Sequence, residues 1–158
     1  MLHLNLIVLG KLKEKYWVTA EAEYLKRLQS FAKVKILELK EESFLKKDNF
    51  EIVKQKEAEK IKKIIPANSF LIVLDSKGKE FTSEDFSIKL QQLEQSGQYN
   101  SLTFIIGGPL GLDKEILNLA DLKLSFSAMT FTHQMIRIFL LEQIYRGFMI
   151  KENRQYHY

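Results

Sequence analysis

Apolar side chains gather in several short runs along the chain, separated by longer segments of mixed polarity. Residues 4–10 (LNLIVLG), 69–75 (SFLIVLD) and 101–106 (SLTFII) are nearly continuous apolar stretches, which is typical of buried strands. Residues 33–40 (KVKILELK) alternate between charged and apolar positions and predict a half-buried or edge strand. A further short strand is predicted at residues 121–126 (DLKLSF).

Helical segments lie between and after these strands. Residues 13–31 carry apolar side chains every three or four positions, as an amphipathic helix does. Ser83 is the expected N-cap of a later helix. The other predicted helices span residues 49–65 (stopping before Pro66), 83–95, 113–120 and 133–149.

The order of these elements predicts the fold class. Strands and helices follow one another in turn along the chain, and most predicted strands are apolar at successive positions. We therefore expect an α/β protein. Its sheet is expected to be mostly parallel, with helices on both faces. The 158 residues contain no evident linker or repeat, so we predict a single domain spanning residues 1–158.

The last predicted helix is apolar around nearly its whole circumference, and such a helix must be buried on all sides. A second copy of the chain in a two-fold dimer is the simplest cover. A central position within a monomer is the alternative. The apolar residues are Met135, Ile136, Ile138, Phe139, Leu140, Leu141, Ile144, Tyr145 and Phe148.

Small residues follow the ends of predicted strands. The stretch GGPLG occupies residues 107–111, Ser127 and Ala128 follow another strand, and a third strand ends at Leu74–Asp75. Ligands of open parallel sheets bind beyond the carboxyl ends of the strands. We therefore predict an apolar cleft with backbone donors and acceptors, suited to an adenine ring. The glycines match neither the dinucleotide nor the phosphate-loop motif; a tight turn and a plain core are the alternatives.

Composition limits the chemistry available to the chain. It contains no cysteine, which excludes disulfides, thiolate nucleophiles and cysteine-ligated metals, and we expect no metal site. We expect a cytoplasmic protein without a membrane partner, because no apolar run approaches the ~20 residues that span a bilayer and no signal peptide is evident. The net charge is +4, and residues 1–63 carry 15 Lys and Arg against 10 Asp and Glu. Such a surface attracts nucleic acid or is simply solvated.

The C-terminal residues NRQYHY (153–158) combine arginine with aromatic side chains. Chain ends are commonly frayed. However, arginine suits phosphate groups and aromatic rings suit base stacking. The tail, with Arg154, Tyr156 and His157, is therefore a candidate RNA-binding element.

Several stretches together resemble one known family over the full length of the chain. VLGKLKEKYW, IIGGPLG, LSFSAMTFTHQMIRIFLLEQIYRGF and the terminal YHY are similar to the SPOUT-class large-subunit ribosomal RNA pseudouridine N3-methyltransferases. The resemblance implies a homodimer and the SPOUT methyltransferase fold with its C-terminal trefoil knot. Periodicity does not predict the knot, because true knots are nearly absent from proteins. The implied methyl donor is S-adenosylmethionine, and the implied acceptor is N3 of a pseudouridine in helix 69 of 23S rRNA, within the assembled ribosome.

The resemblance also assigns residues to the donor site, and they lie at the three strand ends selected above. Two positions other than the donor-binding residues differ from the family pattern: the family often has proline in place of Thr132 and a charged last residue in place of Tyr158. Carried over by position, the donor-binding residues are Leu74, Gly107, Gly108, Phe126, Ser127, Ala128, Met129, Thr130 and Phe131.

Methylation of N3 requires that its imide proton leave. Histidine titrates near neutrality, so His133 and His157 are candidates to accept the proton. Arg137, Arg154 and Tyr156 are candidates to stabilise charge on the flanking carbonyl oxygens. In the alternatives, His133 caps its helix, Arg137 holds the dimer, or positioning alone drives the reaction. The competing function is a non-catalytic nucleotide- or RNA-binding ribosome assembly factor.

Overall fold

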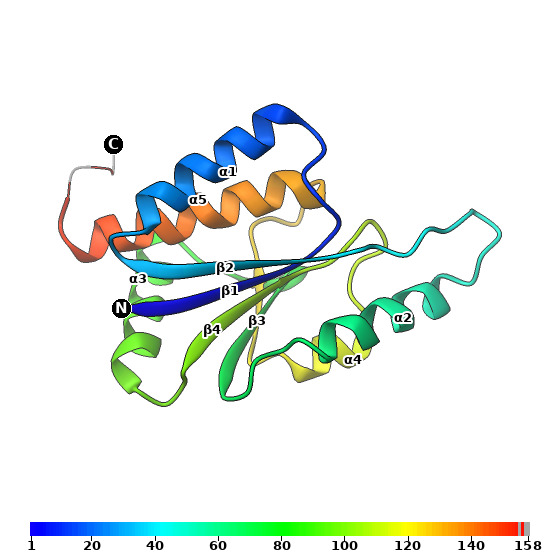
Figure 1. The fold of residues 1–158 in the computed structure, drawn as a ribbon. Coiled ribbons are helices and arrows are strands. Elements are labelled where there is room, and N and C mark those ends of the chain that lie inside the picture. Colours follow the sequence, from blue (N-terminus) through cyan, green and yellow to red (C-terminus); the bar gives the residue numbers. More distant parts are fainter. Residues whose placement is uncertain (155, 157–158) are drawn as a thin grey trace.

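The computed structural model describes residues 1–154 and 156, in which strands and helices alternate strictly (Figure 1). All paired strands run parallel, in the order β2-β1-β4-β3-β5. The predicted α/β class is confirmed. The strands are β1 (Leu2–Leu9), β2 (Ala32–Leu39), β3 (Ser69–Glu80), β4 (Ser101–Ile106) and β5 (Leu122–Ser125). The helices are α1 (Lys15–Leu28), α2 (Phe50–Lys62), α3 (Ser83–Ser96), α4 (Lys114–Leu119) and α5 (His133–Lys151).

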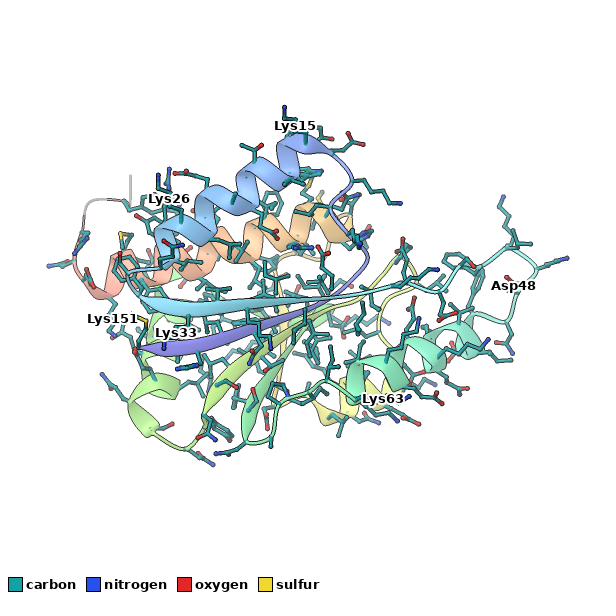
Figure 2. The ribbon with its side chains drawn as sticks, in the orientation of Figure 1. Lys15, Lys26, Lys33, Asp48, Lys63 and Lys151 are labelled. Atoms are coloured by element: carbon teal, nitrogen blue, oxygen red, sulfur yellow. The ribbon has the colours of Figure 1, made fainter. Side chains whose placement is uncertain are left out.

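Helices cover both faces of the sheet, as predicted. Figure 1 shows α1 and α5 on one side of the strands and α2 and α4 on the other. Leu28 of α1, Leu90 of α3 and Leu140 of α5 belong to the core on the first face. Ala58 of α2 and Ile116 of α4 belong to the core on the second face. Side chains fill the space between the sheet and its helices, and the lysines labelled in Figure 2 are exposed on the outside.

The position of each strand in the sheet explains why some strands are continuous apolar runs in the sequence and others are not. β4 lies between β1 and β3 and is buried along its whole length, from Ser101 to Ile106. β2 lies at an edge, and its alternating pattern of charged and apolar residues matches the predicted edge strand. A strand covered on both faces has no solvent-facing side chains, so its sequence cannot alternate.

Several element boundaries differ from the prediction. α2 ends at Lys62, a few residues earlier than expected before Pro66. Thr82 rather than Ser83 is the N-cap of α3, because the Thr82 hydroxyl accepts a hydrogen bond of 3.0 Å from the backbone N–H of Asp85. Ser83 is the first helical residue, and its hydroxyl donates instead to Gln143 at 2.8 Å.

α5 packs against both α1 and α3 as well as the sheet, so its own chain buries most of it. The central-helix alternative therefore accounts for most of its apolar surface. An exposed apolar patch remains near its start, formed by Met129, Phe131 and Phe139. The rings of Phe131 and Phe139 meet edge to face with centroids 5.6 Å apart.

No helix among residues 1–154 is long and apolar enough to cross a bilayer.

Candidate functional site

The three strand ends selected from the sequence are neighbours in the sheet. β4, β3 and β5 lie side by side, and a cavity of about 670 Å³ opens beyond their carboxyl ends. Ligand sites for small molecules typically measure ~300–1,000 Å³. The cavity is therefore of the size that small-molecule ligands occupy. Of the predicted donor-binding residues, these line the cavity: Leu74, Gly107, Gly108, Phe126, Ser127, Met129, Thr130 and Phe131. Ala128 is exposed and does not line it.

The glycine-rich segment after β4 forms a tight turn that also lines the cavity. The backbone N–H of Gly111 donates to the Gly108 carbonyl at 3.0 Å, and Gly111 has a φ of +77°. A Cβ on Gly107 would lie 3.0 Å from Leu112 Cγ and 3.1 Å from the carbonyl carbon of Gly111. Gly107 therefore lets the turn fold back on itself, which brings backbone groups rather than side chains to the cavity wall.

The end of β3 contributes a wall that sequence patterns did not predict. The pairing of β3 with β5 shifts register between Leu74 and Lys79, and residues 75–77 in this excursion line the cavity. A Cβ on Gly78 would lie 2.6 Å from the carbonyl of Lys123, so only glycine allows this close approach of the two backbones. The sequence SKG inside an otherwise strand-like segment was the available signal, since glycine in a strand often marks a bulge.

Ser125 ties two cavity walls together. Its buried hydroxyl lies 3.2 Å from the Ser76 carbonyl and 3.1 Å from the Ser127 carbonyl, so it can donate to either. Ser127 in turn accepts a 3.0 Å hydrogen bond from the backbone N–H of Met129. The loop between β5 and α5 is thereby anchored to the β3 excursion. No local pattern marks this link, because it depends on which strands are adjacent.

His133 opens α5 at the cavity edge and lines the cavity. It does not cap its helix, because the Thr132 hydroxyl accepts the capping hydrogen bond of 3.3 Å from the backbone N–H of Met135. Burial lowers the pKa of His133, while the Glu41 carboxylate partly opposes that shift. The imidazole is therefore neutral at pH 7 and has a nitrogen lone pair available for a proton.

Arg137 lies outside the cavity lining and has partners within its own chain. Its side chain is only 4% exposed and forms ion pairs with Glu21 of α1 and, at 2.9 Å, with Glu38 of β2. Burial raises the pKa of Glu21, although Arg137 acts against that shift. Arg137 thus joins α5 to α1 and β2.

The described tail residues follow the C-terminal end of α5 (Figure 1), whereas residues of its first turn line the cavity. Arg154 pairs with Glu152 at 2.7 Å, and its guanidinium lies 5.8 Å from the ring centroid of Phe31. Tyr156 packs edge to face on Tyr145, and burial raises the pKa of Tyr156 to about 12. The 19 residues of α5 span about 28 Å. His157 lies outside the described residues.

Other cavity residues were not predicted from the sequence. Thr132, Gln134 and Ile136 line the cavity beside His133. The Gln134 side chain also accepts a 2.7 Å hydrogen bond from the backbone N–H of Lys13, which ties the start of α5 to the segment after β1. Leu112 and Leu117 complete the apolar side. Periodicity marked these leucines and Ile136 only as apolar positions, which core packing explains equally well.

The chain is similar to known proteins over nearly its whole length. A family described as "Predicted SPOUT methyltransferase" matches residues 2–157. The chain is 46% identical over 157 residues to a protein of Halothermothrix orenii, covering 98% of each chain. It is 45% identical over 159 residues to a protein of Clostridium acetobutylicum, covering 99% of each, and 43% identical over 161 residues to one of Pelotomaculum thermopropionicum, covering 100% of each. All three relatives are named "Ribosomal RNA large subunit methyltransferase H".

Proposed function

The chain belongs to the SPOUT methyltransferase family, and from this premise we propose that it methylates N3 of a pseudouridine in helix 69 of 23S rRNA. S-adenosylmethionine is the proposed methyl donor. The observation that carries the proposal is the cavity beyond β3, β4 and β5, which contains eight of the nine residues that the family resemblance assigns to the donor. The names of the full-length relatives support ribosomal RNA as the substrate class.

Backbone and apolar groups are the proposed donor contacts. Leu74 and Phe126 offer apolar surface for an adenine ring, and the turn at residues 107–111 offers backbone donors and acceptors. When bound, S-adenosylmethionine supplies an electrophilic methyl group on its sulfonium sulfur and leaves as the neutral thioether. The cavity residues orient the acceptor so that N3 lies in line with the methyl–sulfur bond, because alignment at ~3–3.5 Å supplies much of the rate.

His133 is the proposed general base. Its imidazole is neutral at pH 7 because burial lowers its pKa, so it can take the N3 proton as the N3–methyl bond forms. The electron pair of the broken methyl–sulfur bond stays on sulfur. No net oxidation or reduction occurs, and the proton ends on His133 before passing to solvent.

Two copies of the chain are proposed to form the working enzyme in the cytoplasm. The exposed patch of Met129, Phe131 and Phe139 offers apolar surface to a second copy. Within one chain, Tyr156 packs on Tyr145, about 18 Å along α5 from His133, so Arg154 and Tyr156 are proposed to act, with His157, at the partner's cavity. There they stabilise charge on the pyrimidine carbonyl oxygens and contact the RNA.

Labelled methyl transfer tests the function directly. Ribosomes from cells that lack this modification are incubated with the protein and methyl-labelled S-adenosylmethionine, and the digested 23S rRNA is analysed by nucleoside mass spectrometry. We expect label in 3-methylpseudouridine and nowhere else. Absence of label from the rRNA contradicts the proposed function.

A non-catalytic assembly factor is the second candidate, and calorimetry separates the two. An enzyme binds S-adenosylmethionine and its demethylated product. A pure assembly factor binds neither, although it still binds ribosomal particles.

A further inference from the structure

Two buried polar atoms beside the cavity have no hydrogen-bond partner among residues 1–154 and 156. They are Oε2 of Glu41, which follows β2, and Nε2 of His133, which begins α5. Buried polar atoms in folded proteins are paired in about 90% of cases or more. Two such atoms in one place therefore call for a common explanation.

Both atoms face the same small region above Gly10, the residue that follows β1. The position that a Cβ on Gly10 would take lies 3.0 Å from His133 Nε2 and 3.3 Å from Glu41 Oε2. Gly10 has a φ of +87°, a conformation that favours glycine. Because Gly10 has no side chain, both atoms border the same small space.

Among the described residues, the other charged groups nearby do not form hydrogen bonds with these two atoms, so Glu41 and His133 remain free to pair with each other. Lys13 and Arg137 also act on His133, but Arg137 is held by its own two carboxylates. Glu57 of α2 is buried near Glu41, and its Oε1 accepts a 2.9 Å hydrogen bond from the backbone N–H of Glu42. Burial raises the pKa of Glu57, and the nearby carboxylates add to that shift.

We propose that Glu41 is a positioning residue that orients His133 and fixes its tautomer. An ionised carboxylate can only accept, so pairing requires that Nε2 carry the hydrogen. Nδ1 is then unprotonated in the neutral ring and becomes the nitrogen that takes the proton from the acceptor base. After the transfer, the Glu41 carboxylate stabilises the imidazolium. This inference rests on the proposed role of His133 as the base.

Nitrogen-15 NMR of histidine-labelled full-length protein tests the tautomer without any substrate. We expect His133 to be protonated on Nε2 in the unaltered protein, and Glu41→Ala to give a mixture of tautomers. Glu41→Met keeps the side-chain length, so it gives the same change if Glu41→Ala fails to fold. Glu42→Ala is the matched control, because that neighbouring carboxylate pairs with Lys60 and should leave the His133 signals unchanged. Protonation on Nδ1 in the unaltered protein, or unchanged His133 signals in Glu41→Met, overturns the proposal.

The pH profile of single-turnover methyl transfer gives a second readout. Glu41 raises the pKa of His133, so its removal lowers that pKa and moves the acid limb of the profile to lower pH. The rate on the plateau should fall at least about tenfold, as expected when a base loses the group that orients it, while donor affinity stays within about twofold. An unchanged profile and plateau in Glu41→Met overturn the proposal. If no variant, and not even the unaltered protein, methylates rRNA, the proposed function fails, while the NMR result still decides the role of Glu41.

Discussion

Gly107 illustrates how one missing side chain shapes the cavity. A valine there would push against Leu112 and Gly111, whose atoms lie 3.0–3.2 Å from the added Cβ, so the turn must open. We expect Gly107→Val to stay folded and to weaken donor binding at least about tenfold, or 1.4 kcal/mol. Calorimetry with S-adenosylmethionine measures this.

Gly97 provides the control for that experiment. It is the left-handed C-cap of α3, with a φ of +60° and no atom within 4 Å of the position that a Cβ would take. Gly97→Ala should cost about 1 kcal/mol of stability because of this conformation, yet leave donor affinity unchanged. Unaltered donor affinity in folded Gly107→Val contradicts the role assigned to the turn.

Arg137 is a second single-residue test. Removing it leaves the carboxylates of Glu21 and Glu38 without their buried cation, so Arg137→Met should lower the free energy of unfolding by about 3 kcal/mol at pH 7. Because burial raises the pKa of Glu21 in the folded state, that carboxyl takes up a proton as the pH falls from 7 toward 4.5, and the deficit should shrink.

Urea unfolding at both pH values measures the effect. Arg27→Met is the control, because Arg27 forms an exposed pair with Glu23 and should change stability by less than about 1 kcal/mol. A stable Arg137→Met protein that has lost only its activity would instead support the catalytic role suggested by the sequence.

Arg137 also shows what the sequence did not predict for a single residue, namely its ion-pair partners. Its place in an apolar helix was visible, but its partners lie 116 and 99 positions away in the sequence. Periodicity reports which face of a helix is apolar, and it does not report what that face meets. The pairing of Ser125 with the carbonyl group of Ser76, 49 positions away, was hidden for the same reason.

At the scale of elements, two threonine caps allow a matched comparison. Thr82 and Thr132 each accept a hydrogen bond from a backbone N–H in the first turn, of α3 and α5 respectively, but only Thr132 lines the cavity. Thr82→Ala and Thr132→Ala should each lower stability by about 1 kcal/mol. Only Thr132→Ala should also weaken donor binding, since it loosens the turn into α5.

Thermal unfolding and calorimetry on the same two proteins provide the comparison. Equal donor affinities in the two variants would mean that the start of α5 takes no part in the site.

Periodicity identified every strand and helix of the described chain, and it failed mainly at boundaries. β3 was expected to end at residue 75, yet it continues to Glu80 through a register shift against β5. That extension depends on the approach of Gly78 to the backbone of Lys123, a tertiary contact of which the sequence shows only the glycine. Similarly, Thr82 and Ser83 are both good caps, and only the position of Gln143 explains why the Ser83 hydroxyl is used elsewhere.

At the scale of the whole molecule, the cavity depends on strand order. The sequence predicted three loops at the carboxyl ends of strands, but nothing in the periodicity places β4, β3 and β5 next to one another. Their adjacency makes one cavity out of three separate loops. The trefoil knot is likewise a property implied by the family, because local patterns carry no information on how a chain threads.

The described part of the tail separates the proposed catalytic groups within one chain. His133 is the first residue of α5, whereas Arg154 follows the last turn of that helix and Tyr156 packs back on Tyr145, about 18 Å along the helix from His133. Because the two sets of groups lie apart within one chain, we propose that the tail of one copy acts at the cavity of a second copy. The proposed function therefore depends above all on a site shared between two chains.

Mixing two inactive proteins tests the shared site. One protein ends at Glu152 and lacks the tail, and the other carries Gly107→Val and lacks a working donor site. In their heterodimer, the intact tail and the intact cavity belong to different chains. With heterodimers verified by native mass spectrometry, we expect methyl transfer to the ribosome to return. Continued inactivity of the verified heterodimer would contradict a site shared between two copies.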